Sequence, residues 1–217
     1  FFKLYKKFSG MTGTAETAKD EFQEVYNKEV FVVPTHKPIR RKDLPDVFYL
    51  TENGKLNYIV EEVRTMHRRG QPVLIGVPSV EKSRLIGNLL EEKGIPHQIL
   101  NARYNEREAG QIAQAGQEGI VTVATNMAGR GTDIVLNSGV GLMGGLHVIG
   151  TEHHRAKRID DQLRGRAGRQ GEAGSSQFHI SMEDELIQVF GSEKLWQVVE
   201  NIDLPEDRPM DEILFQE

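Results

Sequence analysis

The 217-residue sequence contains no cysteine. This absence excludes a disulfide scaffold, a thiolate zinc site and a cysteine nucleophile. No stretch approaches the ~20 consecutive apolar residues that a membrane-spanning helix needs, and the first residues lack the pattern of a secretory signal peptide. We therefore expect a cytoplasmic protein. Because the sequence begins with Phe1 rather than Met, we also expect a fragment of a longer chain.

Two motifs of nucleotide-hydrolysing proteins are also missing. The sequence contains no G-x-x-x-x-G-K-[ST] loop, and no apolar strand segment is followed by the acidic residues of a Walker-B motif. Without these motifs a chain cannot by itself cradle the β- and γ-phosphates of a nucleotide or hold Mg²⁺. Any nucleotide site in this sequence is therefore expected to be half of a complete site.

Short apolar segments alternate with helical patterns through most of the chain. Residues 57–69 carry apolar side chains at helical spacing, whereas 73–77 is a continuous apolar run typical of a strand covered on both faces. Further strands are expected at 97–100, 120–124, 146–149 and 177–182, and further helices at 80–93, from 105, at 155–167 and from 184. Strands separated by helical crossovers predict an α/β fold, a parallel sheet with helices on both faces.

Polar, glycine-rich or basic segments follow three of the predicted strands. They begin at Pro78, Thr125 and Gly150. In open parallel sheets, ligands bind beyond the carboxyl ends of the strands. Of the 22 glycines, 14 lie between 110 and 174, and glycine lets the backbone approach a ligand closely. We therefore expect a phosphate-binding site at this edge of the sheet.

The segment 162–171 (QLRGRAGRQG) carries the clearest chemical signal. Arg166 and Arg169 stand three apart, so on a helix they would share one face. A planar guanidinium with a fixed charge suits γ-phosphate oxygens better than a lysine would. The alternative is a solvated basic face, which we disfavour because Gly165 and Gly168 would each cost ~1 kcal/mol inside a helix.

A second candidate site is the segment 129–133 (GRGTD), which follows the strand predicted at 120–124. Glycine permits positive φ, and the Asp133 carboxylate can accept a hydrogen bond from a ribose hydroxyl. An ordinary strand-to-helix turn with an Asx cap explains the same residues. Taken alone, this segment favours the ordinary turn.

Four segments together resemble the SecA family. They are 9–17 (SGMTGTAET), 125–134 (TNMAGRGTDI), 145–152 (GLHVIGTE) and 158–171 (RIDDQLRGRAGRQG). The resemblance covers nearly the whole chain and implies the ATPase motor of bacterial preprotein translocation. This motor has two RecA-like domains of the helicase superfamily 2 type, with ATP bound between them.

The resemblance also implies a division of the chain. Residues 1–34 are expected to form the tail of the first nucleotide-binding domain and a linker, and 35–190 the second, Walker-less RecA-like motor domain. Residues 191–217 are expected to begin a helical scaffold. The proline-containing segment 35–46 itself is typical of a linker, and it is the clearest candidate boundary.

Particular residues match the family's motifs. Arg166 and Arg169 match its arginine fingers, which act on ATP bound to the first domain. Asp133, together with Arg130 and Gly131, matches the motif that senses the nucleotide at its ribose and phosphates. By this resemblance Arg166 and Arg169 are catalytic residues, whereas Arg130, Gly131 and Asp133 bind the cofactor together with Gln162.

Three further residues match motifs that couple hydrolysis to movement. Gln162 is expected to link the nucleotide to domain closure, and Thr12 and Thr14 to link hydrolysis to motion. The implied cofactor is ATP with Mg²⁺, the metal being held by the absent first domain, so the isolated fragment is expected to be inactive. The implied partners are that first nucleotide-binding domain, preprotein substrates and a SecYEG-type channel. The implied location is the cytoplasm, with peripheral association with the cytoplasmic membrane.

The sequence departs from the family's pattern at two places. Residues 153–158 read HHRAKR where the family usually has Arg-His-Glu-Ser-Arg-Arg, and Asn137-Ser138 replaces a double glycine. These departures leave open the accessory paralogue that exports a small set of substrates.

Two other functions and a metal site were weighed from the residues. The C-terminal lobe of a nucleic-acid helicase is the main alternative, but a net charge of −5 and 7% aromatic residues give it weak support, so no nucleic-acid partner is expected. A non-catalytic regulatory module is the other. His147, His153 and His154 do not predict a metal site, because no carboxylate beyond Glu152 stands at ligand spacing.

Overall fold

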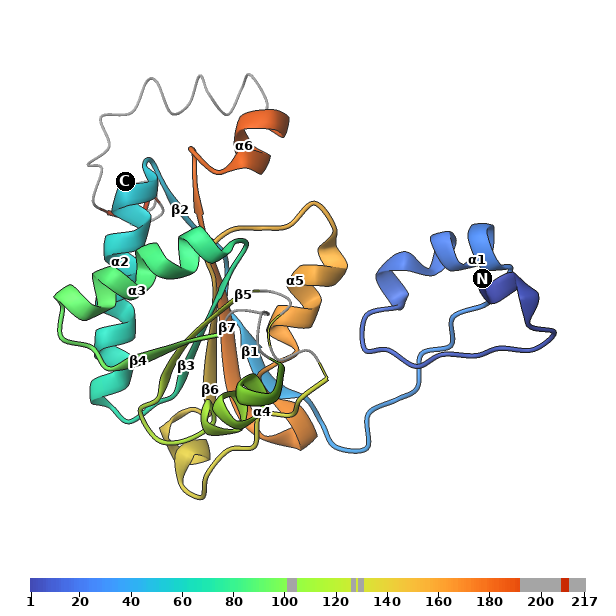
Figure 1. Ribbon diagram of the computed structural model, residues 1–217, viewed down its shortest axis with the longest axis horizontal. Helices are drawn as coiled ribbons and strands as arrows, with labels where there is room; N and C mark the ends of the chain where they lie inside the picture. Colours follow the sequence, from blue (N-terminus) through green and yellow to red (C-terminus); the bar gives the residue numbers. More distant parts are fainter. Residues whose placement is uncertain (101–104, 126–127, 129–130, 192–207, 211–217) are drawn as a thin grey trace.

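The structure is a computed structural model that describes residues 1–100, 105–125, 128, 131–191 and 208–210. In this part of the chain, seven strands form one parallel sheet in the order β1-β7-β6-β3-β5-β4 (Figure 1). The seventh strand, β2, pairs with β7 further along from β1. The strands are β1 (Arg40–Asp43), β2 (Val47–Tyr49), β3 (Val73–Val77), β4 (His97–Leu100), β5 (Val121–Thr125), β6 (Leu146–Gly150) and β7 (Ala173–Ser181).

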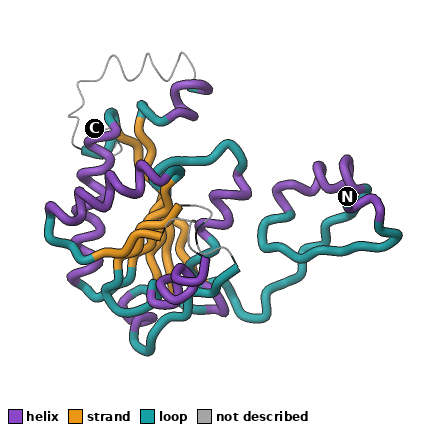
Figure 2. The backbone as a smooth tube through the Cα atoms, in the orientation of Figure 1, coloured by secondary structure: helices purple, strands orange, loops and turns teal. Residues whose placement is uncertain are grey.

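Helices cover both faces of this sheet. Helices α2 and α3 pack on one face, and α4 and α5 pack on the other (Figures 1 and 2). The described helices are α1 (Lys19–Tyr26), α2 (Glu52–Arg68), α3 (Val80–Glu92), α4 (Asn105–Gln114), α5 (Lys157–Arg164) and α6 (Glu185–Phe190). The predicted α/β fold, a RecA-like parallel sheet between two helical layers, is therefore confirmed.

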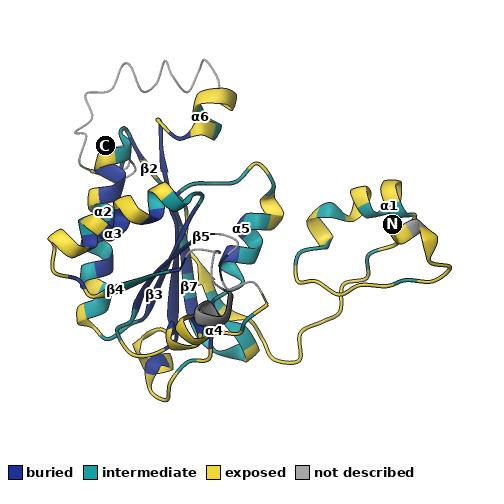
Figure 3. Cartoon of the chain, in the orientation of Figure 1, coloured by how far each residue is buried: buried dark blue, intermediate teal, exposed yellow. Residues whose placement is uncertain are grey.

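The central strand β3 contributes to two hydrophobic cores. Val73, Ile75 and Val77 pack with α2 and α3, whereas Leu74 faces the opposite core with α4 and α5. A Cβ added at Gly76 would lie 2.4 Å from Leu163 Cδ2, so the missing side chain lets α5 lie close to the sheet. Figure 3 shows the result, with buried strands between helices whose outer faces are exposed.

Three local predictions are wrong. Residues 40–43, within the segment predicted as a linker, form β1, because the backbone pairs with β7 although the sequence there is charged and exposed. The helical pattern at 80–93 predicts Leu85 among the core-facing side chains, but Leu85 is 44% exposed, since α3 turns Ile86 and Leu90 toward the sheet instead. The helix expected over 155–167 ends at Arg164. The predicted domain limits are not tested by these differences and stay predictions.

The N-terminal residues lie to one side of the sheet, on the side of α5, which contacts the 3-10 helix Glu16–Ala18 (Figure 1). They form α1 and two short 3-10 helices, Phe2–Leu4 and Glu16–Ala18. Phe2 and Phe8 contact Tyr26 with ring centroids 6.0 and 6.2 Å apart. No residue of α1 is buried, so this segment is held mainly by its own aromatic contacts and by its contact with α5.

A buried polar cluster joins α2 to the sheet. Glu62 on α2 lies 3.0 Å from His179 Nε2 and 3.4 Å from His147 Nε2, and both histidines are fully buried. The far nitrogens of these rings contact the hydroxyls of Tyr49 and Ser175 at 2.9 and 2.7 Å. Burial alone would raise the pKa of Glu62, but the two histidines beside it lower this pKa to about 2.

Replacing Glu62 with alanine is expected to lower the free energy of unfolding by about 3 kcal/mol, because two buried imidazoles lose their charged partner. The neighbouring Glu61, in an exposed pair with Arg64, is the matched control, and Glu61→Ala should cost under about 1 kcal/mol. Urea unfolding of the chain measures both values. Since the Glu62 pKa is lowered, its contribution is present above the unfolded pKa of ~4.3 and is lost as pH falls toward 2.

Candidate nucleotide half-site

Neither candidate arginine lies on α5. Arg166 is in the turn that follows the helix, and Arg169 is the first residue of a short 3-10 helix, Arg169–Gly171. Gly165 caps α5, and Gly168 has φ 69°, a left-handed conformation that ends the path of α5. A Cβ at Gly168 would also lie 2.5 Å from Arg41 Cβ, so a larger residue would collide with β1. The prediction that Gly165 and Gly168 lie inside a helix is therefore wrong. These glycines shape the turn that follows α5.

Both arginines nevertheless reach the loop after β5. Arg166 donates hydrogen bonds to the carbonyl oxygens of Ala128 and Thr132 at 3.3–3.4 Å. Arg169 donates to the Asp133 carboxylate at 2.7 Å and to the Gly165 carbonyl at 3.0 Å. The two segments singled out from the sequence thus meet at the carboxyl edge of the sheet.

The loop after β5 carries three of the predicted ligands, and one of them, Asp133, contacts Arg169. Gly131 has φ 83° with no other atom within 4 Å of an added Cβ, so its backbone is open to approach. Asp133 is 47% exposed and is engaged by Arg169, which is 35% exposed. The third predicted ligand, Arg130, lies outside the described residues. An ion pair this exposed contributes at most ~1 kcal/mol, so an incoming anion can replace Asp133 at little cost.

The predicted coupling residues also meet. Gln162 on α5 donates a hydrogen bond from Nε2 to Thr14 Oγ1 at 3.3 Å. Thr14 in turn lies 3.4 Å from Thr12, hydroxyl to hydroxyl, and its backbone N–H donates to Thr12 Oγ1 at 3.3 Å. The N-terminal segment is therefore linked to α5, the helix that precedes the segment with Arg166 and Arg169. We call this segment, residues 165–171, the arginine turn.

A cavity of about 30 Å³ lies between β5 and α5. Thr125, Ala128, Gln162, Leu163 and Arg166 are among the residues that line it. A volume of this size holds about one water molecule and is far too small for a nucleotide. In the described part of the chain, Arg166, Arg169 and Asp133 form one side of the candidate nucleotide site.

A different set of charges occupies the same edge of the sheet beyond β3 and β6. Lys82, in the first turn of α3, contacts Glu52 and Glu152, and Ser79 caps that helix by accepting a hydrogen bond from the Lys82 N–H at 3.1 Å. Burial alone would lower the pKa of Lys82, but the two carboxylates raise it. This cluster could not be predicted from the sequence, because its three residues come from three separate segments that no motif connects.

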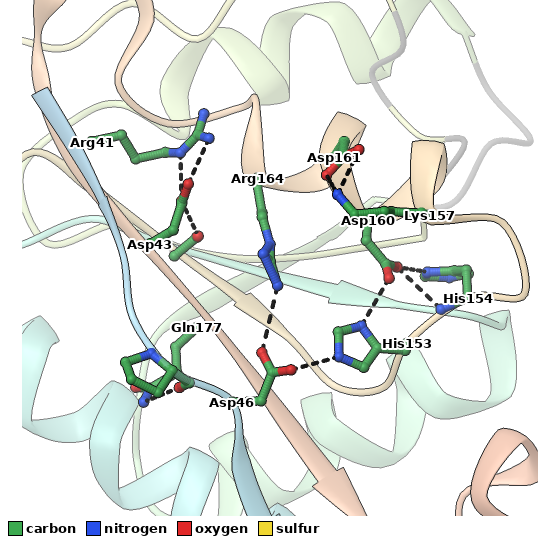
Figure 4. A network of polar contacts seen from close by, with 12 residues as sticks. Arg41, Asp43, Asp46, His153, His154, Lys157, Asp160, Asp161, Arg164 and Gln177 are labelled. Carbon is green, nitrogen blue, oxygen red and sulfur yellow. Dashed lines mark hydrogen bonds and ion pairs between the residues drawn. The ribbon is translucent and has the colours of Figure 1, made fainter. Parts of the chain in front are cut away.

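Arg164 and three further charged residues form a network around α5 (Figure 4). His153 lies between Asp46 and Asp160, with each ring nitrogen 2.8 Å from one carboxylate. Asp46 also accepts a hydrogen bond from Arg164 at 3.5 Å. The sequence analysis considered His153 only as a metal ligand. Among the residues the structure describes, no group of three or more acidic or histidine side chains is placed to hold a metal ion.

The fold is that of a RecA-like α/β domain, and the sequence contains no G-x-x-x-x-G-K-[ST] phosphate-binding loop. Two solved structures share this architecture with TM-scores of 0.55: Escherichia coli DEAD-box protein SrmB and yeast DEAD-box splicing factor Prp28. SrmB is 21% identical, and the match covers 82% of this chain and 95% of that one. For Prp28 the identity is 14%, with 91% and 40% covered. At these identities the likeness establishes the fold alone.

The sequence comparisons identify the family. The family model for the SecA P-loop domain matches residues 38–142 and 137–207. Over all 217 residues the chain is 54% identical to a protein translocase subunit SecA of Caldicellulosiruptor saccharolyticus, of which it covers 26%. It is also 54% identical over 210 residues to that of Thermotoga maritima, with 97% of this chain and 24% of the relative covered. The chain belongs to the SecA family, and it spans about a quarter of the length of these relatives.

Proposed function

We propose that the chain is the second motor domain of an ATP-driven protein translocase, which supplies Arg166 and Arg169 to ATP bound on the first motor domain. The observation that carries this proposal is the convergence of both arginines on the loop that holds Gly131 and Asp133. Guanidinium groups fit phosphate oxygens through paired hydrogen bonds and a charge that does not titrate. In this role they stabilise the negative charge that develops on the transferred phosphoryl group.

The donor set of this side of the site suits a phosphate but not a metal ion. Arg169 is partly exposed, and its Nη1 is paired with the exposed Asp133 carboxylate, which a phosphate can replace. Within the described residues no cluster of acidic side chains could hold Mg²⁺. Bound ATP would supply the phosphoryl group. We assign the binding of its Mg²⁺ to the first domain. The residues of this chain bind the phosphate and ribose side, with Arg130 proposed to act beside Gly131 and Asp133.

Coupling to movement is proposed to run through α5. Gln162 lies on the helix just before the arginine turn and contacts Thr14 in the N-terminal segment. A displacement of the arginines toward a phosphate would therefore be felt at Thr14 and Thr12. We propose that this contact links closure of the nucleotide cleft to motion of preprotein through a SecYEG-type channel. Such a role places the protein in the cytoplasm, at the face of the cytoplasmic membrane.

The polar cluster beyond β3 and β6 favours a protein translocase over a nucleic-acid helicase. At this edge of the sheet, the charge of Lys82 is balanced by Glu52 and Glu152. A nucleic-acid backbone laid over these strand ends would meet two carboxylates and a lysine that is already paired, and phosphate binding depends on available positive charge. Separately, none of the helices described is both long and apolar enough to cross a membrane.

The isolated chain is expected to release no phosphate from ATP above background, because it has no phosphate-binding loop. Adding the separately produced upstream domain should restore ATPase activity, and membranes that contain the channel, together with preprotein, should raise the rate further. The matched control is the same mixture with Arg169→Ala in this chain. Robust turnover by the chain alone would contradict the half-site, and stimulation by RNA but not by preprotein and membranes would favour the helicase.

A further inference from the structure

His153 occupies a junction of three segments that are far apart in the sequence. It follows β6, whereas Asp46 lies between β1 and β2 and Asp160 lies in the first turn of α5 (Figure 4). Its ring stacks on the buried Phe178 of β7, with centroids 4.6 Å apart and planes inclined by 16°. The side chain is about one-third exposed, so its ring can exchange protons with solvent.

The geometry around His153 requires a positively charged ring. Nδ1 lies 2.8 Å from Asp160 and Nε2 lies 2.8 Å from Asp46, so both ring nitrogens face an acceptor. A neutral imidazole has one N–H and could donate to only one of these carboxylates. The protonated ring donates to both, and each carboxylate then takes part in a charge-assisted hydrogen bond.

The two carboxylates bound by His153 act on opposite ends of α5. Asp160, in the first turn, also accepts hydrogen bonds from the backbone N–H and the ring of His154. Asp46 accepts from Arg164, the last residue of α5, whose guanidinium lies 4.4 Å from the Phe178 ring centroid. A helix of eight residues is too short to be stable alone. Its orientation therefore depends on contacts such as these.

We propose that His153 is a positioning residue of the nucleotide half-site, which holds both ends of α5 through Asp46 and Asp160 and so fixes the turn that carries Arg166 and Arg169. This inference rests on the proposed function, since it assigns His153 a task in the same reaction. The arginine turn begins directly after Arg164. A change in the position of α5 therefore displaces Arg166, which is two residues further along the chain.

The contacts of His153 with Asp46 and Asp160 also make the position of α5 dependent on pH. The hydrogen bonds to Asp160 and Asp46 raise the pKa of His153 to about 9. The charged groups that face the ring are Asp46 from the β1–β2 connection and Asp160 and Arg164 from α5, while the neighbouring His154 binds Asp160. Because the His153 pKa is raised, the stabilisation is complete below the unfolded pKa of ~6.5 and is lost as pH rises through about 9.

The test compares His153→Gln and His153→Arg in the full-length motor. We expect His153→Gln to lower kcat about tenfold with KM nearly unchanged, since small displacements of catalytic groups slow the chemical step. It should also increase hydrogen exchange of the α5 backbone amides. His153→Arg keeps a cation that can donate to both carboxylates. It should keep kcat near the wild-type value at neutral pH and remove the alkaline decline that we expect of wild type near pH 9.

The matched control is His97→Gln, a partly buried histidine on the edge strand β4 that is remote from α5. It should leave both readouts unchanged. Equal pH profiles for wild type and His153→Arg, or an unchanged kcat in His153→Gln, would overturn the inference. If Arg169→Ala slows the same motor while His153→Gln does not, only the inference about His153 is wrong. If Arg169→Ala leaves the rate unchanged, the proposed function is wrong and the inference falls with it.

Discussion

Replacing Arg169 with alanine in the full-length motor is expected to lower the ATPase kcat by ~10³–10⁵, the range for a lost arginine finger. The physical reason is that this guanidinium would contact the phosphoryl group only as negative charge develops on it. In the resting structure it is held by Asp133 in a pair too exposed to resist exchange. Steady-state phosphate release at saturating ATP measures the effect.

The design separates a catalytic loss from a loss of folding. Arg64→Ala removes an arginine of similar exposure from α2, where its partner is Glu61, and it should change kcat by less than about twofold. Nucleotide affinity of the Arg169→Ala variant should stay close to that of wild type, because the interaction lost belongs to the transition state. An unchanged rate in Arg169→Ala would instead support a regulatory module that takes no part in turnover.

Much of the fold could be predicted because its central strands are mostly apolar. Residues 73–77 and 146–149 have no polar positions facing solvent, so burial on both faces was the only arrangement consistent with their composition. The edge strand β1 gave no such signal. Its sequence, Arg40–Asp43, forms a strand because the backbone of β7 offers hydrogen bonds, and this depends on tertiary structure.

The candidate site was found for a reason that was partly wrong. The pattern of arginines and glycines predicts that Arg166 and Arg169 approach a phosphate together, and this stays a prediction. In the structure both side chains reach the loop after β5. The expected helix did not form beyond Arg164, because Gly168 takes a left-handed conformation next to β1. The glycines therefore indicate a tight turn, and the sequence alone could not distinguish this turn from a helical face.

The network around His153 could not be predicted from local sequence. Its partner Asp46 lies 107 positions away, and only the packing of the β1–β2 connection against α5 brings the two together. A motif reports residues that are close in the chain, whereas the seat of α5 depends on a contact that closes a long loop. The fold had to be known before His153 could be given a role.

The second large effect is expected at Arg166. Its guanidinium donates to the carbonyls of Ala128 and Thr132 at 3.3–3.4 Å and so lies at the loop that would face a phosphate. Arg166→Ala should lower kcat by ~10²–10³, as the loss of one donor to a developing charge does in other enzymes. It should also weaken nucleotide binding, unlike Arg169→Ala, because the loop that holds Gly131 and Asp133 loses a contact.

The double variant decides whether the two arginines act as one unit. If both stabilise the same phosphoryl group, removing the second should cost far less than it does alone, and the double variant should stay within about tenfold of Arg169→Ala. Full multiplication of the two losses would show that they serve separate steps. In that case Arg166 would be assigned to holding the loop after β5, and Arg169 alone would remain the finger.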